Sequence, residues 1–346
     1  MKILAIETSC DETAAAVIEN GKKIISNVIA SSAEMHQKTG GIIPETAARE
    51  QVRAIIPVID EALNPLRKKW EEIDSLAVTI GPGLIGSLLV GVETAKTLSL
   101  LTGKPLIPVN HVLAHLYANF LNEKLPEFPA IGLVVSGGHT ELFVMEKINK
   151  LKWVGGTIDD AAGEAFDKTA RLLGLGFPGG PAIAAEAAKF KIQNSKFKIK
   201  LPRPMINDKS LNFSFSGLKT AVLREVNKLK ADKQFNNSTI QQLAYEIQEA
   251  ITDVLVEKTL RAAKKYKVKS ILLGGGVAAN MRLAEKFKAE KLNINLFIPL
   301  PSLCTDNAAY IGSYAYFFNK YIAWQKIEAK PDLAVEVRAN GGIIML

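Results

Sequence analysis

Apolar runs alternate with polar turns from the start of the chain. Runs over residues 2–7, 14–19 and 23–31 predict three strands, and Asn20-Gly21 predicts a hairpin turn between the last two. The spacing of apolar residues then predicts a helix over 45–63, a buried strand over 75–80, a helix over 84–101 and a strand over 105–109. The first third of the chain is therefore expected to be a mixed α/β unit.

The same order restarts near residue 130. Strands are predicted over 130–135, 139–145 and 153–158, helices over 161–173 and 239–265, a strand over 270–273, a helix from Val277, a strand over 295–299 and a helix over 306–318. Two meanders, each followed by strands alternating with helices, predict a duplicated α/β fold of the actin-like ATPase (ASKHA, ribonuclease H-like) type, with a ligand cleft between lobes 1–128 and 129–346. A helical and basic insertion is expected at about 160–266, with the last helix free to pack back on the first lobe. Fold alone leaves kinase, chaperone and scaffold roles open.

His111 and His115 lie four residues apart in a chain with 4 histidines. On a helix this spacing puts both imidazoles on one face, close enough to share a metal ion. The alternative is a pair of imidazoles that merely packs on a helix face. A zinc protease built on this spacing needs Glu after the first histidine as its general base, and this chain has Val112. The pair therefore predicts a metal that holds or polarises a substrate.

Three glycine loops favour an anionic ligand. They are Ser136-Gly137-Gly138, Gly179-Gly180-Pro181 and Gly274-Gly275-Gly276. Each loop alone is explained equally well as a turn, but together they favour a nucleotide or another phosphorylated ligand, and the helix expected after the third would add a favourable dipole. Neither a P-loop nor a dinucleotide-binding fingerprint is present in the sequence.

The net charge of +8 is concentrated between Glu186 and Lys233, where twelve basic residues face four acidic ones. Phenylalanines interleave with these lysines at positions 190, 197, 213 and 215. This pattern predicts a surface that follows a nucleic-acid backbone. A solubilising lysine face is the alternative.

Length, cysteine content and hydropathy indicate a cytoplasmic protein of two lobes. Cys10 and Cys304 are too few for a disulfide framework, and small buried side chains are their expected role. The start of the chain lacks the pattern of a secretory signal. The apolar stretch 84–101 is not expected to span a membrane, because it is interrupted by Gly86, Ser87, Gly91, Glu93 and Lys96.

Six ordered motifs between Lys2 and Phe318 resemble those of the tRNA threonylcarbamoyladenosine-forming transferases, a family once described as O-sialoglycoprotein endopeptidases. The motifs lie at 7–13, 81–86, 111–115, 135–142, 213–220 and 304–309. The resemblance implies transfer of a threonylcarbamoyl group from threonylcarbamoyl-AMP to the exocyclic amine of the adenosine 3′ of the anticodon. The tRNAs concerned read codons that begin with A.

The resemblance also implies roles for individual residues. One divalent transition metal, iron or zinc, would be held by His111, His115 and Asp306. The adenylate would lie on the loop Val134, Val135, Ser136, Gly137 and Gly138, with its nucleoside part near Asp167, Gly180 and Asn280. Asp11 and Glu12 are candidates for orienting a water at the metal or assisting deprotonation of the amine, with backbone capping as the alternative. No side-chain nucleophile is needed, because the donor is already an activated mixed anhydride.

Two residues depart from the family pattern. Ala184 stands where many members have Asp, and Gln51 stands where His is common. The family implies tRNA and three companion proteins as partners: a threonylcarbamoyl-AMP synthase, a paralogous dimer partner and a small ATPase. A small-molecule kinase of the same fold and a non-catalytic actin-like or chaperone-like module are the competing hypotheses. The predicted metal site argues against the second of them.

Overall fold

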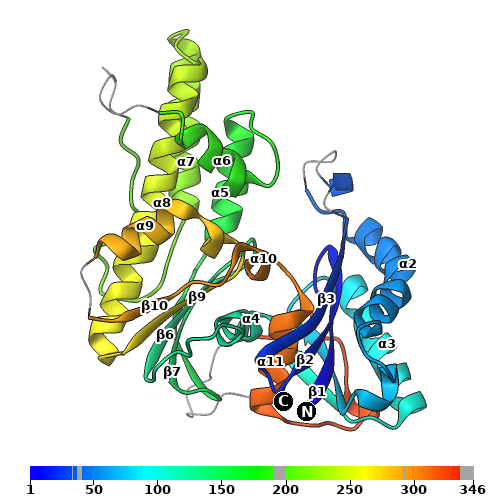
Figure 1. The fold of residues 1–346 in the computed structure, drawn as a ribbon. Helices are drawn as coiled ribbons and strands as arrows, with labels where there is room; N and C mark the ends of the chain where they lie inside the picture. Colours follow the sequence, from blue (N-terminus) through cyan, green and yellow to red (C-terminus); the bar gives the residue numbers. More distant parts are fainter. Residues whose placement is uncertain (33, 37–40, 191–198, 291–292, 336–346) are drawn as a thin grey trace. The chain divides into compact units, whose positions relative to one another are not determined.

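A computed structural model describes residues 1–32, 34–36, 41–190, 199–290 and 293–335. The chain divides into two compact units, each built on a five-stranded sheet (Figure 1). Unit 1 comprises Met1–Pro126, Lys147–Lys152 and the chain from Pro299, and unit 2 comprises Glu127–Glu146 and Trp153–Ile298.

The sheet of unit 1 has the order β3-β2-β1-β4-β5. Its strands are β1 (Lys2–Glu7), β2 (Glu12–Glu19), β3 (Lys23–Ser31), β4 (Ser75–Gly81) and β5 (Leu106–Asn110). The first three form an antiparallel meander, whereas β4 is parallel to both β1 and β5. Strand β1 is apolar along nearly its whole length because both faces of the sheet are covered.

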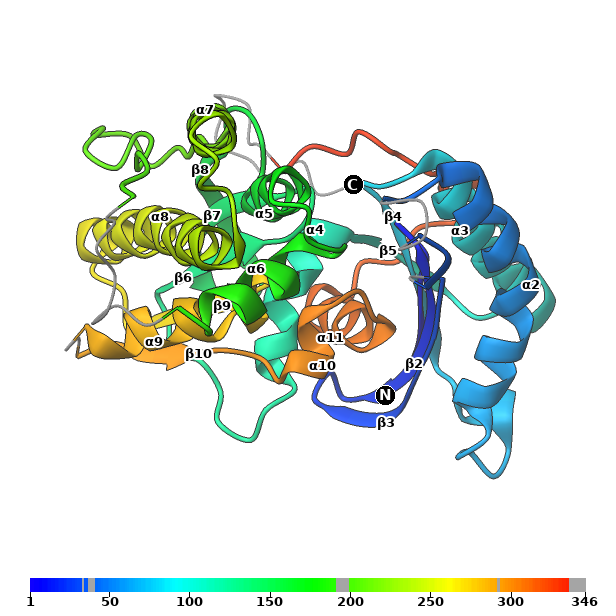
Figure 2. The ribbon, with the colours of Figure 1, turned by 90° about the horizontal axis from the view of Figure 1, so that it is seen from above.

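Helices cover the two faces of this sheet (Figure 2). Helices α2 (Pro44–Leu63) and α3 (Ile85–Thr102) lie on one face, and α11 (Ala308–Phe318) lies on the other. Leu4 and Ile6 of β1 belong to the core beneath α2 and α3. On the other face, Gly312 of α11 lies so close to the sheet that an added Cβ would come within 2.6 Å of Ile18. This close approach places the residues that precede α11 near the end of the central strands.

The sheet of unit 2 has the order β10-β9-β6-β7-β8, which matches the order of unit 1 when it is read from the opposite edge. Its strands are β6 (Ala130–Val135), β7 (Thr140–Lys147), β8 (Lys150–Gly156), β9 (Ser270–Gly274) and β10 (Asn295–Phe297). Read from the third strand of the meander, both sheets run third, second, first, fourth, fifth. The duplicated α/β fold predicted from the sequence is confirmed.

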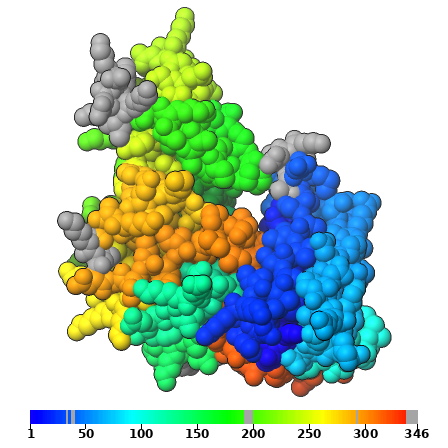
Figure 3. Space-filling model, viewed as in Figure 1, coloured from blue at the N-terminus to red at the C-terminus, as the bar shows by residue number. Residues whose placement is uncertain are grey.

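Helices make up much of unit 2. They are α5 (Ala162–Leu172), α6 (Gly179–Ala187), α7 (Ser216–Ala231), α8 (Asn237–Tyr266) and α9 (Met281–Ala289). The longest of them, α8, begins with a capping box. The Asn236 side-chain oxygen accepts from the Thr239 N–H, and the Thr239 hydroxyl oxygen accepts from the Asn236 N–H. Helix α7 lies at the surface of the unit, in yellow-green in Figure 3.

Several sequence predictions of local structure are wrong. Helices α6 and α7 lie within the helical insertion expected at about 160–266, but no range was predicted for either of them. The helix expected from Val277 is one 3-10 turn, η4 (Gly276–Ala279), and α9 begins only at Met281. The helix expected from Asp306 begins at Ala308, because Asn307 is its N-cap.

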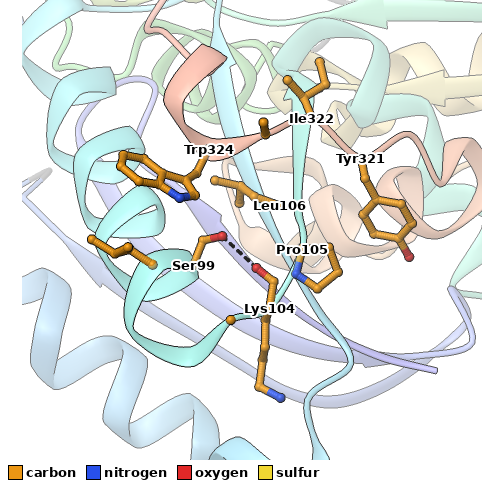
Figure 4. A pocket seen from close by; sticks show the side chains of 10 residues that line it. Ser99, Lys104, Pro105, Leu106, Tyr321, Ile322 and Trp324 are labelled. Carbon is orange, nitrogen blue, oxygen red and sulfur yellow. Dashed lines mark hydrogen bonds between the residues drawn. The ribbon is translucent and has the colours of Figure 1, made fainter.

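The far edge of the first sheet is partly closed by the chain near its C-terminal end. The Ile322 N–H donates to the Leu106 carbonyl oxygen at 3.0 Å, which forms an antiparallel bridge with edge strand β5. A pocket of about 410 Å³ lies beside this bridge, lined in part by Tyr321 and Trp324 (Figure 4). At its wall, the Ser99 hydroxyl donates to the Lys104 carbonyl oxygen at 2.6 Å, just where α3 ends.

Among the described residues, α3 is the helix that is long and apolar enough to cross a membrane by length and composition. A single helix of this kind is weak evidence, since core helices pass the same test. Helix α3 packs against α2 and β4 of its own unit, and 33% of it is buried.

Candidate metal centre and substrate loops

The two predicted histidines lie directly after edge strand β5. Asn110 ends that strand and accepts a hydrogen bond from the Leu113 N–H at 3.1 Å, which caps α4 (His111–Ala114). The His115 N–H donates to the His111 carbonyl oxygen, so one α-helical turn separates the two imidazoles. The chain then tightens into the 3-10 helix η2 (His115–Phe120). The expected helix is therefore confirmed over a single turn, and that turn is enough to put both rings on one face.

Asp306 meets these histidines from a distant part of the sequence. It lies between α10 (Pro301–Cys304) and α11, and its Oδ1 is 3.7 Å from Nε2 of His111 and 3.7 Å from Nε2 of His115. The Tyr310 hydroxyl donates to the same oxygen at 3.4 Å. Within unit 1 the structure thus brings together all three residues that the family resemblance grouped.

The donor set fits a transition-metal ion. The three ligand atoms lie within 4.8 Å of one another. Ligands at about 2.0–2.2 Å from a tetrahedral ion are separated by roughly 3.3–3.6 Å, which is close to the two 3.7 Å separations. Two imidazoles and one carboxylate also leave coordination positions open for a substrate. Val112 is buried in the core, so it leaves no place for the general base of a zinc protease.

Sequence reasoning missed the buried carboxylate that contacts this group. Glu7 ends β1, and its Oε2 lies 3.1 Å from Nδ1 of His111. Burial opposes a charge on Glu7, but His111, together with the hydrogen bonds from Thr79 and Ser9, holds its pKa below the ordinary value. The signal was a single acidic residue at the end of an otherwise apolar strand.

The electrostatics of the three ligands favour a cation among them. Burial disfavours a charged imidazole, but the carboxylates of Glu7 and Asp306 prevail and raise the pKa of His111 to about 9. Burial, opposed by His111, raises the pKa of Asp306 to about 6. At neutral pH and without a metal, a proton on His111 therefore supplies the positive charge that the buried carboxylates require.

Asp11 and Glu12 lie on a loop that is held through its backbone. The Ser32 hydroxyl donates to the Asp11 carbonyl oxygen at 2.8 Å, and the buried Gln51 amide donates to the carbonyl oxygens of Cys10 and Glu12 at 3.1 and 2.9 Å. Burial, with a hydrogen bond that the protonated Glu12 carboxyl donates to Asp11 and with the charge of Asp306, raises the pKa of Glu12. The surroundings of the Glu12 carboxyl therefore disfavour a negative charge on it.

In unit 2 the first glycine loop joins β6 to β7. The Ser136 N–H donates to the His139 carbonyl oxygen at 2.9 Å, and α5 begins against the loop, with the Gly163 N–H donating to the Ser136 carbonyl oxygen at 3.1 Å. A Cβ added at Gly137 or Gly138 would meet no atom within 4 Å. The packing of the chain therefore does not require glycine at these two positions.

The other substrate-binding candidates also lie in unit 2. Val134 and Val135 are buried in β6, which leaves only their backbone for a ligand. Asp167 accepts from the Gly179 N–H at 2.6 Å, and burial raises the pKa of its carboxyl. Gly180, like Gly137, has open space where a side chain would begin. Asn280 caps α9 through the Leu283 N–H and donates to the Gln248 amide oxygen at 3.1 Å, so one amide hydrogen of Asn280 remains for another acceptor.

The basic segment differs from the surface expected for it. Phe213 and Phe215 are buried, so the prediction that they interleave with lysines on a nucleic-acid surface is wrong. Arg203 forms ion pairs with Glu246 and Asp253, which leaves it unsuited to a phosphate. Lys196, Lys198 and Phe197 lie outside the described residues. The exposed cations of this segment include Arg224, Lys230 and Lys233.

Comparison with known proteins adds independent evidence. A profile of the family described as tRNA N6-adenosine threonylcarbamoyltransferase matches residues 23–313. Proteins of that name from Persephonella marina and Syntrophomonas wolfei are each 48% identical to the chain, over 91% and 96% of its length and 90% and 97% of their own. The one from Thermosipho africanus is 46% identical over 97% of this chain and 100% of its own.

Two solved structures share the fold at low sequence identity. Component A of the (R)-2-hydroxyglutaryl-CoA dehydratase from Acidaminococcus fermentans matches with a TM-score of 0.51 and 15% identity, over 92% of this chain and 98% of its own. Full-length HypF matches with a TM-score of 0.58 and 13% identity, over 93% of this chain and 47% of its own. These likenesses support the actin-like, two-lobed ASKHA fold expected from the sequence.

Proposed function

Because the chain belongs to the tRNA N6-adenosine threonylcarbamoyltransferase family, we propose that it transfers the threonylcarbamoyl group of threonylcarbamoyl-AMP to tRNA. The acceptor is N6 of the adenosine 3′ of the anticodon, in tRNAs that read codons beginning with A. The observation that carries the proposal is the group formed by the buried His111 and His115 and the half-buried Asp306, in a chain so similar to enzymes of that name.

The proposed metal is one divalent transition ion, iron or zinc, held by His111, His115 and Asp306. When bound, it supplies a Lewis acid that stabilises negative charge on the donor. The open coordination positions of a His₂-carboxylate site support this role. The absence of a general base beside His111, where Val112 is buried, favours substrate holding over hydrolysis.

The proposed adenylate site is in unit 2, on the loop Val134–Gly138 and near Asp167, Gly180 and Asn280. Glycine is not needed at positions 137, 138 or 180 for the packing of the chain itself. Such positions allow backbone N–H groups to approach an anion closely. The free carboxylate oxygen of Asp167 and the remaining Asn280 hydrogen suit the hydroxyls and ring nitrogens of a nucleoside.

In the transfer, N6 of the adenosine attacks the carbamoyl carbon. A C–N bond forms, the C–O bond to the phosphate breaks, AMP leaves with that electron pair, and the amine loses a proton. The residues need only position the reactants and stabilise charge, because the donor is already activated. Asp11 and Glu12, which share the loop held by Gln51 and Ser32, are our candidates to assist this deprotonation or to orient a water at the metal.

The proposed partners are tRNA, a threonylcarbamoyl-AMP synthase, a paralogous dimer partner and a small ATPase, all in the cytoplasm and none in a membrane. Nucleoside analysis of tRNA from cells depleted of the protein tests the function. We expect the threonylcarbamoyl modification to disappear, to return with the wild-type gene and to stay absent with His115→Ala. Undiminished modification after depletion would contradict the proposal. A kinase of the same fold would leave the modification intact.

A further inference from the structure

Glu7 is the last residue of β1 and lies against the His111 ring at the nitrogen that does not face Asp306. We propose that Glu7 is a positioning residue for the metal centre: it keeps the imidazole hydrogen on Nδ1 of His111 and so leaves Nε2 to bind the ion. This inference rests on the proposed metal site and adds a residue that binds neither metal nor substrate.

Each oxygen of the Glu7 carboxylate also accepts a hydrogen bond from a residue other than His111. Oε1 accepts from the Ser9 N–H at 2.5 Å, and Oε2 accepts from the Thr79 hydroxyl at 2.6 Å. Thr79 lies on β4, which pairs with β1. The carboxylate is therefore held by β4 and by the turn that follows β1, in addition to its contact with His111.

A carboxylate accepts hydrogen bonds and cannot donate them. The 3.1 Å contact between Oε2 and Nδ1 therefore requires the hydrogen to be on Nδ1. With the hydrogen on Nε2 instead, two acceptor atoms would face each other at that distance in a buried place, which is costly. In the neutral ring, the tautomer that Glu7 selects leaves the lone pair of Nε2 on the side of Asp306, where a metal would replace the proton.

The Ser9 hydroxyl does not make this selection. Its Oγ lies 3.2 Å from the same Nδ1, but a hydroxyl either donates or accepts, and so it suits both tautomers. Glu7 is the partner that distinguishes them. Carboxylates that hold a metal-binding histidine in this way orient the ring and raise its basicity.

Zinc affinity, measured by competition with a chromophoric chelator, tests the inference in the full-length protein. Glu7→Gln keeps the shape of the side chain, but places an N–H₂ group against either Ser9 or His111. We expect its zinc affinity to fall roughly 10–100-fold. Thr79→Val also removes a hydrogen bond from this carboxylate but leaves the His111 contact in place, and we expect it to bind zinc nearly as well as the wild type.

The outcomes separate this inference from the metal site on which it rests. Equal zinc affinity in the wild type and a folded Glu7→Gln variant would overturn the role of Glu7 and leave the metal site standing. No zinc binding by the wild type would overturn both. An equal loss in Glu7→Gln and Thr79→Val would mean that Glu7 only stabilises the fold, and would also overturn the inference.

A second measurement needs no variant and remains decisive if Glu7→Gln does not fold. The chain has 4 histidines, so the imidazole nitrogen signals of the zinc-loaded wild type are few enough to assign by NMR. We expect His111 to carry its hydrogen on Nδ1 and the zinc on Nε2. A hydrogen on Nε2 of His111 would overturn the proposal.

Discussion

The Gln51 side-chain amide donates a hydrogen bond to the Glu12 carbonyl oxygen at 2.9 Å, and thereby ties helix α2 to the loop that presents Asp11 and Glu12. The same amide nitrogen also donates to Cys10 at 3.1 Å. Gln51 departs from the histidine that is common in the family, yet it has a definite structural role in this chain. It fixes the backbone of the loop without contacting the metal ligands.

Gln51→Ala should therefore slow the reaction without releasing the metal. Two buried carbonyl groups would lose their donor, which costs about 1–3 kcal/mol of stability and leaves the carboxylates of the loop less well placed. Elemental analysis and turnover measured on the same preparation check this prediction. Glu61→Ala, at an exposed position of the same helix, is the matched control and should change neither quantity. A Gln51→Ala protein with full activity would show that the loop needs no such restraint.

Metal affinity should depend on pH because a proton and the metal compete for His111. Without metal the pKa of His111 is about 9 and that of Asp306 is about 6. Below pH 9 each bound ion must displace one proton from His111, so the apparent affinity should fall about tenfold per pH unit. Below pH 6 the proton on Asp306 should make this dependence steeper. Zinc titrations between pH 6 and 9 check the slope, and an affinity that does not change over this range would contradict the assignment.

Neighbouring glycines in the third glycine loop should respond differently to alanine. Gly275 has φ 88° and ψ 163°, a conformation that is essentially restricted to glycine, and an added Cβ would lie 2.3 Å from the Val135 carbonyl oxygen. Gly275→Ala should lower the free energy of unfolding by about 1–3 kcal/mol or more. Gly276→Ala meets open space and should unfold like the wild type. Thermal unfolding of the two variants compares them, and equal melting temperatures would refute the prediction.

The basic segment should bind tRNA through only some of its cations. Neutralising Lys196, Lys198 and Lys200 together should weaken tRNA binding and lower the slope of log K against log salt by roughly 0.7–0.9 for each lost phosphate contact. Arg203→Ala removes a charge from the same segment, but one that is already paired with Glu246 and Asp253. It should leave the salt slope unchanged and lower the stability. An unchanged slope in a folded triple variant would place the tRNA surface elsewhere.

The two strand meanders and the histidine pair were predictable because they depend on short-range patterns. Apolar runs between polar turns located both meanders. The spacing of His111 and His115 needs only one helical turn to put the rings on the same face. The helix that begins at His111, α4, is one such turn. Asp306 was added by resemblance to a family, since no local pattern connects it with residues nearly 200 positions earlier.

Other features could not be read from composition because they depend on tertiary contacts. In the sequence, Phe213 and Phe215 resembled surface aromatic residues that stack on bases among lysines. Both side chains are buried in the structure, which the sequence pattern did not reveal. The hydroxyls of Ser214 and Ser216 donate to the Asp159 carboxylate, which belongs to a loop more distant in the sequence. Glu7 was missed for the same reason, since its partners come from β4 and α4. By contrast, α7 had a helical signal in Leu218, Val222, Val226 and Leu229, which the lysines obscured.

Transfer from a synthetic donor tests the central claim most directly. Purified protein and its companion proteins would be incubated with threonylcarbamoyl-AMP and unmodified tRNA in the absence of ATP, and the tRNA nucleosides would be analysed. We predict N6-threonylcarbamoyladenosine 3′ of the anticodon with the wild type. The His115→Ala variant should lose its metal and yield little or no modified nucleoside. The His139→Ala variant should keep its metal. Strict dependence on ATP despite the supplied donor, or equal product with His115→Ala, would contradict a metal-centred transferase.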